Sequence, residues 1–191
     1  RLRKSAIIEM STFHHHLWYI RSRMGAWDHP NRSHKAFIDL HVASNRAFER
    51  AFLPTNLGWW AFKTWTGAQT EPTYVDDIEY LCGKAMGIGA GLSIMGIDPG
   101  TITQAPALPR LAATMRRYET LRRANYFNET VRARLNAPRQ EFGLEQSPTG
   151  EWQFRAVHTH RQRVSGSDAA GYTWTVHNPA GVMAIGDPAE A

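Results

Sequence analysis

The apolar positions of this chain follow two spacings: short continuous runs, and recurrences every three or four residues. Short runs typical of buried strands span residues 7–12, 57–65 and 91–97. Stripes typical of amphipathic helices span residues 34–53, 73–86 and 106–127. Strands that alternate with helices indicate parallel βαβ units. The sequence therefore predicts an α/β fold with three βα units of a partial (β/α)8 (TIM) barrel, and the alternative is an open three-layer sheet.

The pattern changes after residue 136. Polar and apolar residues nearly alternate over residues 152–160, and a second short run spans residues 172–176. Such alternation is typical of antiparallel strands with one face in water. We therefore expect a barrel-like α/β domain over residues 1–136, followed by the start of a β-sandwich-like domain over residues 137–191.

Both predicted domains look incomplete. Three βα units make only part of a closed barrel, and two or three strands are too few for a stable sandwich. The first residue is Arg1 rather than Met, and the segment before residue 7 carries no helix cap. We expect the chain to be a piece of a longer protein and the remainder of that protein to be required for its function.

Composition and charge narrow the possible partners. Hydrophobic residues make up 42% of the chain, which predicts a folded core. The formal net charge is +5, but the densest basic group, Arg116 to Arg123, lies on a predicted helix with Glu119 in it. A solvated helix face explains that group better than a nucleic-acid site. The single cysteine, Cys82, excludes an intrachain disulfide, and no apolar run is long enough to cross a membrane.

Glu71 and Glu9 are the candidate catalytic acids. Glu71 follows the aromatic run that starts at Leu57, and Glu9 lies in the first predicted strand. Strand ends converge on one face of a barrel, where one carboxyl could protonate a glycosidic oxygen while the other attacks or activates water. The alternatives are a solvated loop acid for Glu71 and an ion-paired acid for Glu9. Asp76 and Asp77 are explained by the dipole of the helix that they begin.

A histidine cluster offers a different chemistry. His14 and His16 form an H-x-H pattern after the first predicted strand, and Asp28 could add an oxygen ligand. The later predicted strand ends offer no further histidine. A polar site wall with hydrogen-bonded imidazoles is the simpler interpretation, so our leading hypothesis includes no metal.

Aromatic and basic side chains surround these candidates and suit a carbohydrate. We expect them to bind substrate: Trp18, Arg21, Arg23, Trp27, Asp28 and Trp65. Core aromatics, or bases of a single-stranded nucleic acid, are the alternative interpretations. The glycine-rich run at residues 87–91 precedes a strand instead of following one, and no Walker or G-x-S-x-G pattern occurs, so we expect no cofactor.

The order of these parts resembles the late portion of a glycoside-hydrolase-like (β/α)8 barrel joined to a β-sandwich, of an uncharacterised bacterial type. The segments that carry the resemblance are LGWWAFKTWTGAQTEPTYVDDIEYLCGKAMG, GLSIMGI, EWQFRAVHTHR and YTWTVHNP. The resemblance implies a carbohydrate-active hydrolase with a carbohydrate substrate, and neither a membrane nor a nucleic-acid partner. Two alternatives stay open: a metal-dependent barrel hydrolase that uses the histidine cluster, and a non-catalytic glycan- or nucleic-acid-binding module.

Overall fold

The fold is known from a computed structural model, which describes residues 34–48, 56–62, 72–95, 97–158 and 184–185. The described elements follow one another as α1 (His34–Phe48), β1 (Asn56–Ala61), α2 (Val75–Gly87), β2 (Gly91–Met95), α3 (Pro99–Gln104), α4 (Leu108–Arg123), α5 (Glu129–Leu135), β3 (Glu141–Gln146), β4 (Trp152–Val157) and β5 (Ala184–Ile185). The predicted strand at residues 7–12 and the run at residues 172–176 lie outside the described residues.

The β1–α2–β2 segment is a parallel βαβ unit. β1 pairs with β2 in parallel, with Trp60 opposite Ile94 and Ala61 opposite Met95. This pairing confirms the predicted α/β fold. Within the described residues the parallel sheet has these two strands and does not close into a barrel.

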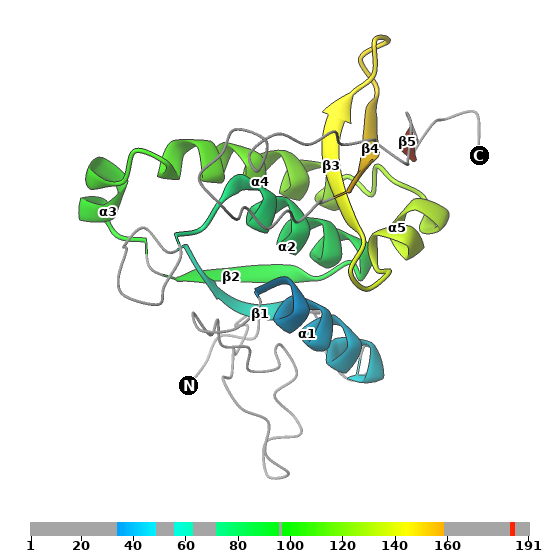
Figure 1. The fold of residues 1–191 in the computed structure, drawn as a ribbon, viewed down its shortest axis with the longest axis horizontal. Coiled ribbons are helices and arrows are strands. Elements are labelled where there is room, and N and C mark those ends of the chain that lie inside the picture. The colour runs from blue at the N-terminus through cyan, green and yellow to red at the C-terminus, as the bar shows by residue number, and fades with distance from the viewer. Residues whose placement is uncertain (1–33, 49–55, 63–71, 96, 159–183, 186–191) are drawn as a thin grey trace, which may run out of the picture.

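Helix α2 lies at the centre of the described fold (Figure 1), with α1, α4, α5 and β3 packed against it. Ile78 and every residue from Tyr80 to Gly87 are buried. A helix that is buried on nearly all sides is a core helix rather than an amphipathic surface helix. The helix ends where Gly89 adopts a positive φ of 68°, a common way for helices to stop.

Helix α4 buries a different stripe from the predicted one. Leu108, Leu111 and Leu121 are buried as expected, but Ala112 is exposed and Tyr118 is almost fully buried. The helix ends at Arg123 instead of continuing to residue 127, because Asn125 takes a positive φ of 48°. Phe127 then turns back into the core.

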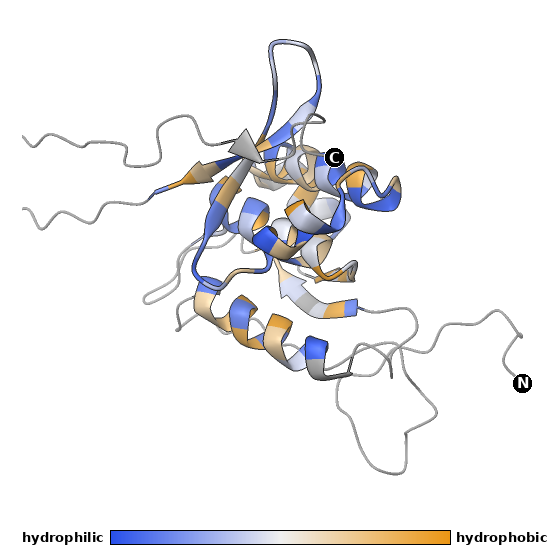
Figure 2. Cartoon of the chain, turned by 90° about the vertical axis from the view of Figure 1, so that its right-hand side faces the viewer, coloured by the Kyte–Doolittle hydropathy of each residue, from blue (hydrophilic) through white to orange (hydrophobic). Residues whose placement is uncertain are grey.

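The segment after residue 136 forms antiparallel strands, and β4 (Trp152–Val157) confirms most of the strand predicted at residues 152–160, whose last two residues lie outside the described part. β3 pairs with β4, and β4 pairs with the short β5. Phe142, Leu144 and Phe154 belong to the same core cluster as Ile78 and Tyr118. The hydrophilic turn between β3 and β4 projects beyond the helices (Figure 2). The sandwich and the domain boundary at residue 136 stay predictions.

No helix in the described part of the chain is long and apolar enough to cross a membrane.

Candidate functional site at the carboxyl edge of the parallel strands

The parallel pairing of β1 and β2 brings their carboxyl ends to one edge of the sheet. From this edge the chain continues from β1 to α2 and from β2 to α3. In Figure 1 the edge lies on the left, on the side of α3. Ligands of α/β proteins bind at the carboxyl ends of the strands, so this edge is the candidate site.

The residues predicted to act at this site lie outside the described residues. Glu71 and Trp65 belong by sequence to the connection between β1 and α2. The others belong to the first 33 residues: Glu9, His14, His16, Trp18, Arg21, Arg23, Trp27 and Asp28. Their proximity to one another and their roles stay predictions.

The start of α2 is fixed by hydrogen bonds at this edge. The carboxylate of Asp77 accepts the backbone N–H of Tyr74 at 2.9 Å. The hydroxyl of Thr73 lies 3.5 Å from the carbonyl oxygen of Ala61, the last residue of β1. Tyr74 is therefore the N-cap of α2 and Asp77 its capping partner, whereas Thr73 is buried and its hydroxyl faces β1.

The acids that the structure describes at this edge, Asp76, Asp77 and Asp98, all bind structural partners. Asp98 caps α3: it accepts the backbone N–H of Thr101 at 2.9 Å, and its own N–H donates to the Thr101 hydroxyl at 2.9 Å. These hydrogen bonds, the backbone one above all, hold the pKa of Asp98 below its usual value. Asp98 is therefore an ionised cap, and Asp77 caps the start of α2 in a similar way.

Lys35 joins this edge to the antiparallel strands. Its Nζ lies 2.9 Å from Asp76 at the start of α2 and 2.6 Å from Glu141 at the start of β3. Burial lowers the pKa of Lys35, but the hydrogen bonds to Glu141 and Asp76 raise it by more, so the pKa lies above its usual value. The first turns of α1 and α2 and the start of β3 are thus held together by one cation.

A buried ionisable cluster lies deeper between α1 and α2. Lys84 is 1% exposed and lies 3.7 Å from Asp39, and its Nζ donates to the carbonyl oxygens of Ala137 and Gln140. The Tyr80 hydroxyl donates to Asp39 at 2.7 Å. Burial lowers the pKa of Lys84 although Asp39 opposes this shift, and burial together with Asp39 raises the pKa of Tyr80.

This cluster fixes the fold rather than performing chemistry. The donors of Lys84 point at protein acceptors, and its charge also lies 4.7 Å from the centre of the Tyr80 ring. Sequence reasoning missed the cluster because Lys84 stands among apolar residues of one helix, whereas Asp39 belongs to another. The available signal was a lysine within residues 80–87, which are otherwise without charge, since buried lysines are almost always paired.

Within the described residues, no group of three histidine, cysteine, aspartate or glutamate side chains could hold a metal ion. Cys82 is buried, and burial raises the pKa of its thiol. A buried thiol with a raised pKa is a poor nucleophile.

Comparisons with protein-family models, with curated proteins and with solved structures found no match to this chain.

Proposed function

We propose that this chain is part of a carbohydrate-active hydrolase of the (β/α)8-barrel type. The observation that carries the proposal is the parallel β1–α2–β2 unit, which is the repeating unit of such a barrel. The connection that contains Glu71 starts at the carboxyl end of β1, the side on which barrel enzymes bind their substrates.

Glu71 and Glu9 are the proposed catalytic carboxyls. One would protonate the leaving oxygen of a glycosidic bond, and the other would attack the sugar or activate water. The aromatic and polar groups would bind the sugar: Trp18, Arg21, Arg23, Trp27, Asp28 and Trp65.

The described part of the edge supports Glu71 over its acidic neighbours. Asp76 is bound to Lys35, and Asp77 caps the helix. Neither acid is therefore available for a second role without releasing the start of α2. Tyr74 leaves its side chain 53% exposed beside these acids, and an exposed aromatic ring at this position suits the apolar face of a sugar.

The test is Glu71→Gln in the intact protein, assayed against a panel of glycosides and polysaccharides. Loss of a general acid or base lowers the turnover number by about 10²- to 10⁴-fold, and the circular dichroism spectrum is expected to stay unchanged. Glu151→Gln is the matched control, because Glu151 is exposed on the turn between β3 and β4. The assignment fails if Glu71→Gln turns over as fast as the wild type. The hydrolase proposal itself fails if the wild type cleaves no member of the panel.

A further inference from the structure

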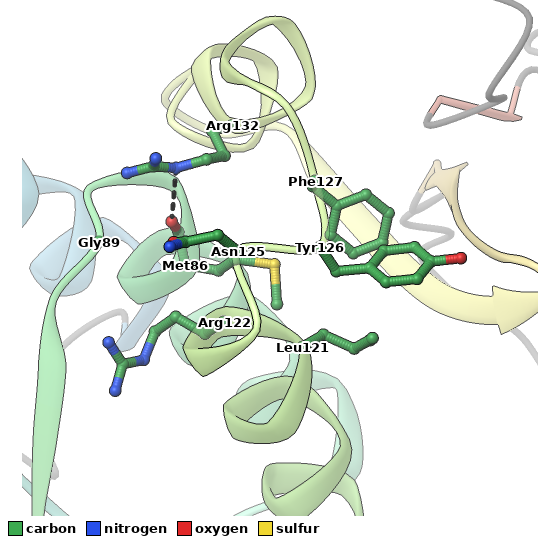
Figure 3. Close-up of a pocket in the computed structure, with 8 residues that line it drawn as sticks. All are labelled: Met86, Gly89, Leu121, Arg122, Asn125, Tyr126, Phe127 and Arg132. Atoms are coloured by element: carbon green, nitrogen blue, oxygen red, sulfur yellow. Dashed lines mark hydrogen bonds between the residues drawn. The ribbon is translucent and has the colours of Figure 1, made fainter.

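A hollow lies at the other end of the parallel strands, where α2 passes into β2 (Figure 3). It is an open space of about 220 Å³ between the end of α2, the end of α4 and helix α5. Part of this space is continuous with the solvent, so the hollow suits one small, partly hydrated group rather than a sugar chain or a nucleotide.

Arg132 forms one wall of the hollow. Its Nε donates to the carbonyl oxygen of Met86 at 3.3 Å, which fixes the guanidinium beside the end of α2. A Cβ at Gly89 would lie 2.9 Å from Nη2, so the close approach of this group depends on the glycine. We find no acceptor for Nη2 among the described residues.

The carboxylate that pairs with Arg132 is a weak partner. Glu129 lies 3.5 Å from Nη1 and is 81% exposed. Exposed pairs of this kind contribute little to stability because water screens them. An anion that enters the hollow can therefore replace this contact at little cost.

Arg122 and Asn125 supply further donors. Glu119 accepts hydrogen bonds from Nε and Nη2 of Arg122 at 2.8 and 2.9 Å, and within the described part of the chain Nη1 has no acceptor. The side-chain amide of Asn125 makes no hydrogen bond to the residues that the structure describes. Figure 3 shows the polar ends of Arg132, Asn125 and Arg122 on one side of the hollow, whereas Tyr126, Phe127 and Leu121 lie on the other.

Helix electrostatics account for part of this arrangement. Arg122 and Arg132 lie near the carboxyl ends of α4 and α5, where cations compensate the helix dipole. Compensation explains why arginines occur there. It does not explain why both arginines and the Asn125 amide line the same hollow.

We propose that this hollow binds a small oxyanion, a phosphate or carboxylate group, between Arg132, Asn125 and Arg122. Guanidinium groups bind such oxygens through short, charge-assisted hydrogen bonds. The site is distinct from the carboxyl edge, because it lies at the opposite end of β2. It therefore binds its anion independently of any hydrolase activity.

The test is a calorimetric titration of the intact protein with inorganic phosphate and, separately, with acetate at low ionic strength. We expect saturable binding of at least one of these anions, and the tighter of the two identifies the chemical class. Arg132→Gln is expected to weaken binding about tenfold or more, since a charge-assisted hydrogen bond is lost. Arg134→Gln, on the same helix but outside the hollow, is the matched control and is expected to bind as the wild type does.

A second variant keeps the test valid if Arg132→Gln folds poorly. Asn125→Asp keeps a side chain of the same shape that also tolerates a positive φ. It replaces the N–H donors of the side-chain amide with an anionic acceptor. It is expected to abolish binding while the circular dichroism spectrum stays unchanged. The proposal is overturned if neither anion saturates the wild type, if the Arg132 and Arg134 variants lose affinity equally, or if Asn125→Asp binds normally.

Discussion

At the scale of single residues, the most informative side chain is Lys84, a lysine inside the core. Its charge is tolerated because Asp39 and the carbonyl oxygens of Ala137 and Gln140 surround it. The backbone N–H of Arg139 donates to the other oxygen of Asp39 at 2.9 Å, so the same carboxylate also holds the turn before β3. A buried ion pair is weak evidence for stability, but it specifies which surfaces meet.

Two glycines of α2 offer a matched test of packing at the residue scale. A Cβ at Gly87 would lie 2.9 Å from the carbonyl oxygen of Arg132, a backbone atom that cannot move away easily. A Cβ at Gly83 would meet Tyr118 at 4.0 Å, an ordinary contact. Replacing a helical glycine by alanine stabilises the folded state by roughly 0.5–1 kcal/mol, because the unfolded backbone has less freedom to lose. This contribution is the same in principle at both positions.

We therefore expect opposite results from the two substitutions. Gly87→Ala is expected to lower the free energy of unfolding by about 1–3 kcal/mol through overpacking, whereas Gly83→Ala is expected to leave it unchanged or raise it. Urea denaturation of both variants measures the difference. Equal effects of the two substitutions would show that α5 does not pack against the end of α2 in solution.

At the scale of elements, the hydrophobic pattern predicted α2, β1 and β2 well because each has one dominant spacing. It did not predict β3, although Phe142 and Leu144 alternate with polar residues, because the strand is short and begins directly after a turn. The position of Tyr118 in the core was also missed, since the stripe of α4 continues through a threonine that is buried beside it. Pairings between distant elements, such as Lys84 with Asp39, leave no local signal.

The contact between α2 and β3 predicts a dependence of stability on pH. Glu79 is half-buried beneath β3, and burial raises its pKa above the usual value although the Leu144 N–H and Arg117 oppose this shift. The folded state therefore binds more protons than the unfolded state between pH 4.5 and the raised pKa. Across this window the contribution of Glu79 to stability falls as the pH rises.

Glu79→Gln removes this titration and keeps an oxygen that can accept the Leu144 N–H. The free energy of unfolding of the wild type, minus that of the variant, is expected to decrease from pH 4.5 toward neutrality. Urea denaturation at several pH values measures the difference, with Glu151→Gln on the exposed turn as the control. A difference that stays constant or grows over this range would contradict the burial of the carboxyl.

At the scale of the whole molecule, the sequence predicted the mixed α/β fold, whereas the partial barrel and the catalytic site stay proposals. The helix and strands of the parallel unit, and the antiparallel strand β4, are of the types that the spacing of apolar residues predicted. The acids and aromatics of the candidate site, from Glu9 to Glu71, lie outside the described residues. The part of the candidate site that the structure describes is the carboxyl edge of β1 and β2.

The antiparallel strands share a core with the helices, and this arrangement predicts how the molecule unfolds. The Phe154 ring is fully buried, with its centre 5.9 Å from that of Tyr118 on α4 and 4.8 Å from that of Phe127. Removing a buried phenylalanine costs about 3–5 kcal/mol. If β4 and the helices unfold as one cooperative unit, a substitution that destabilises the strand destabilises the helices by the same amount.

Phe154→Ala in the intact protein tests this coupling. The helical signal in far-ultraviolet circular dichroism is expected to disappear at a lower urea concentration than in the wild type. The free energy of unfolding calculated from this signal is expected to fall by about 3–5 kcal/mol. Val157→Ala on the same strand is the control, since Val157 is exposed and its loss is expected to change stability by less than about 0.5 kcal/mol. An unchanged helical transition in Phe154→Ala would instead place the strands in a separately folding domain, with its boundary at residue 136 as the sequence predicts.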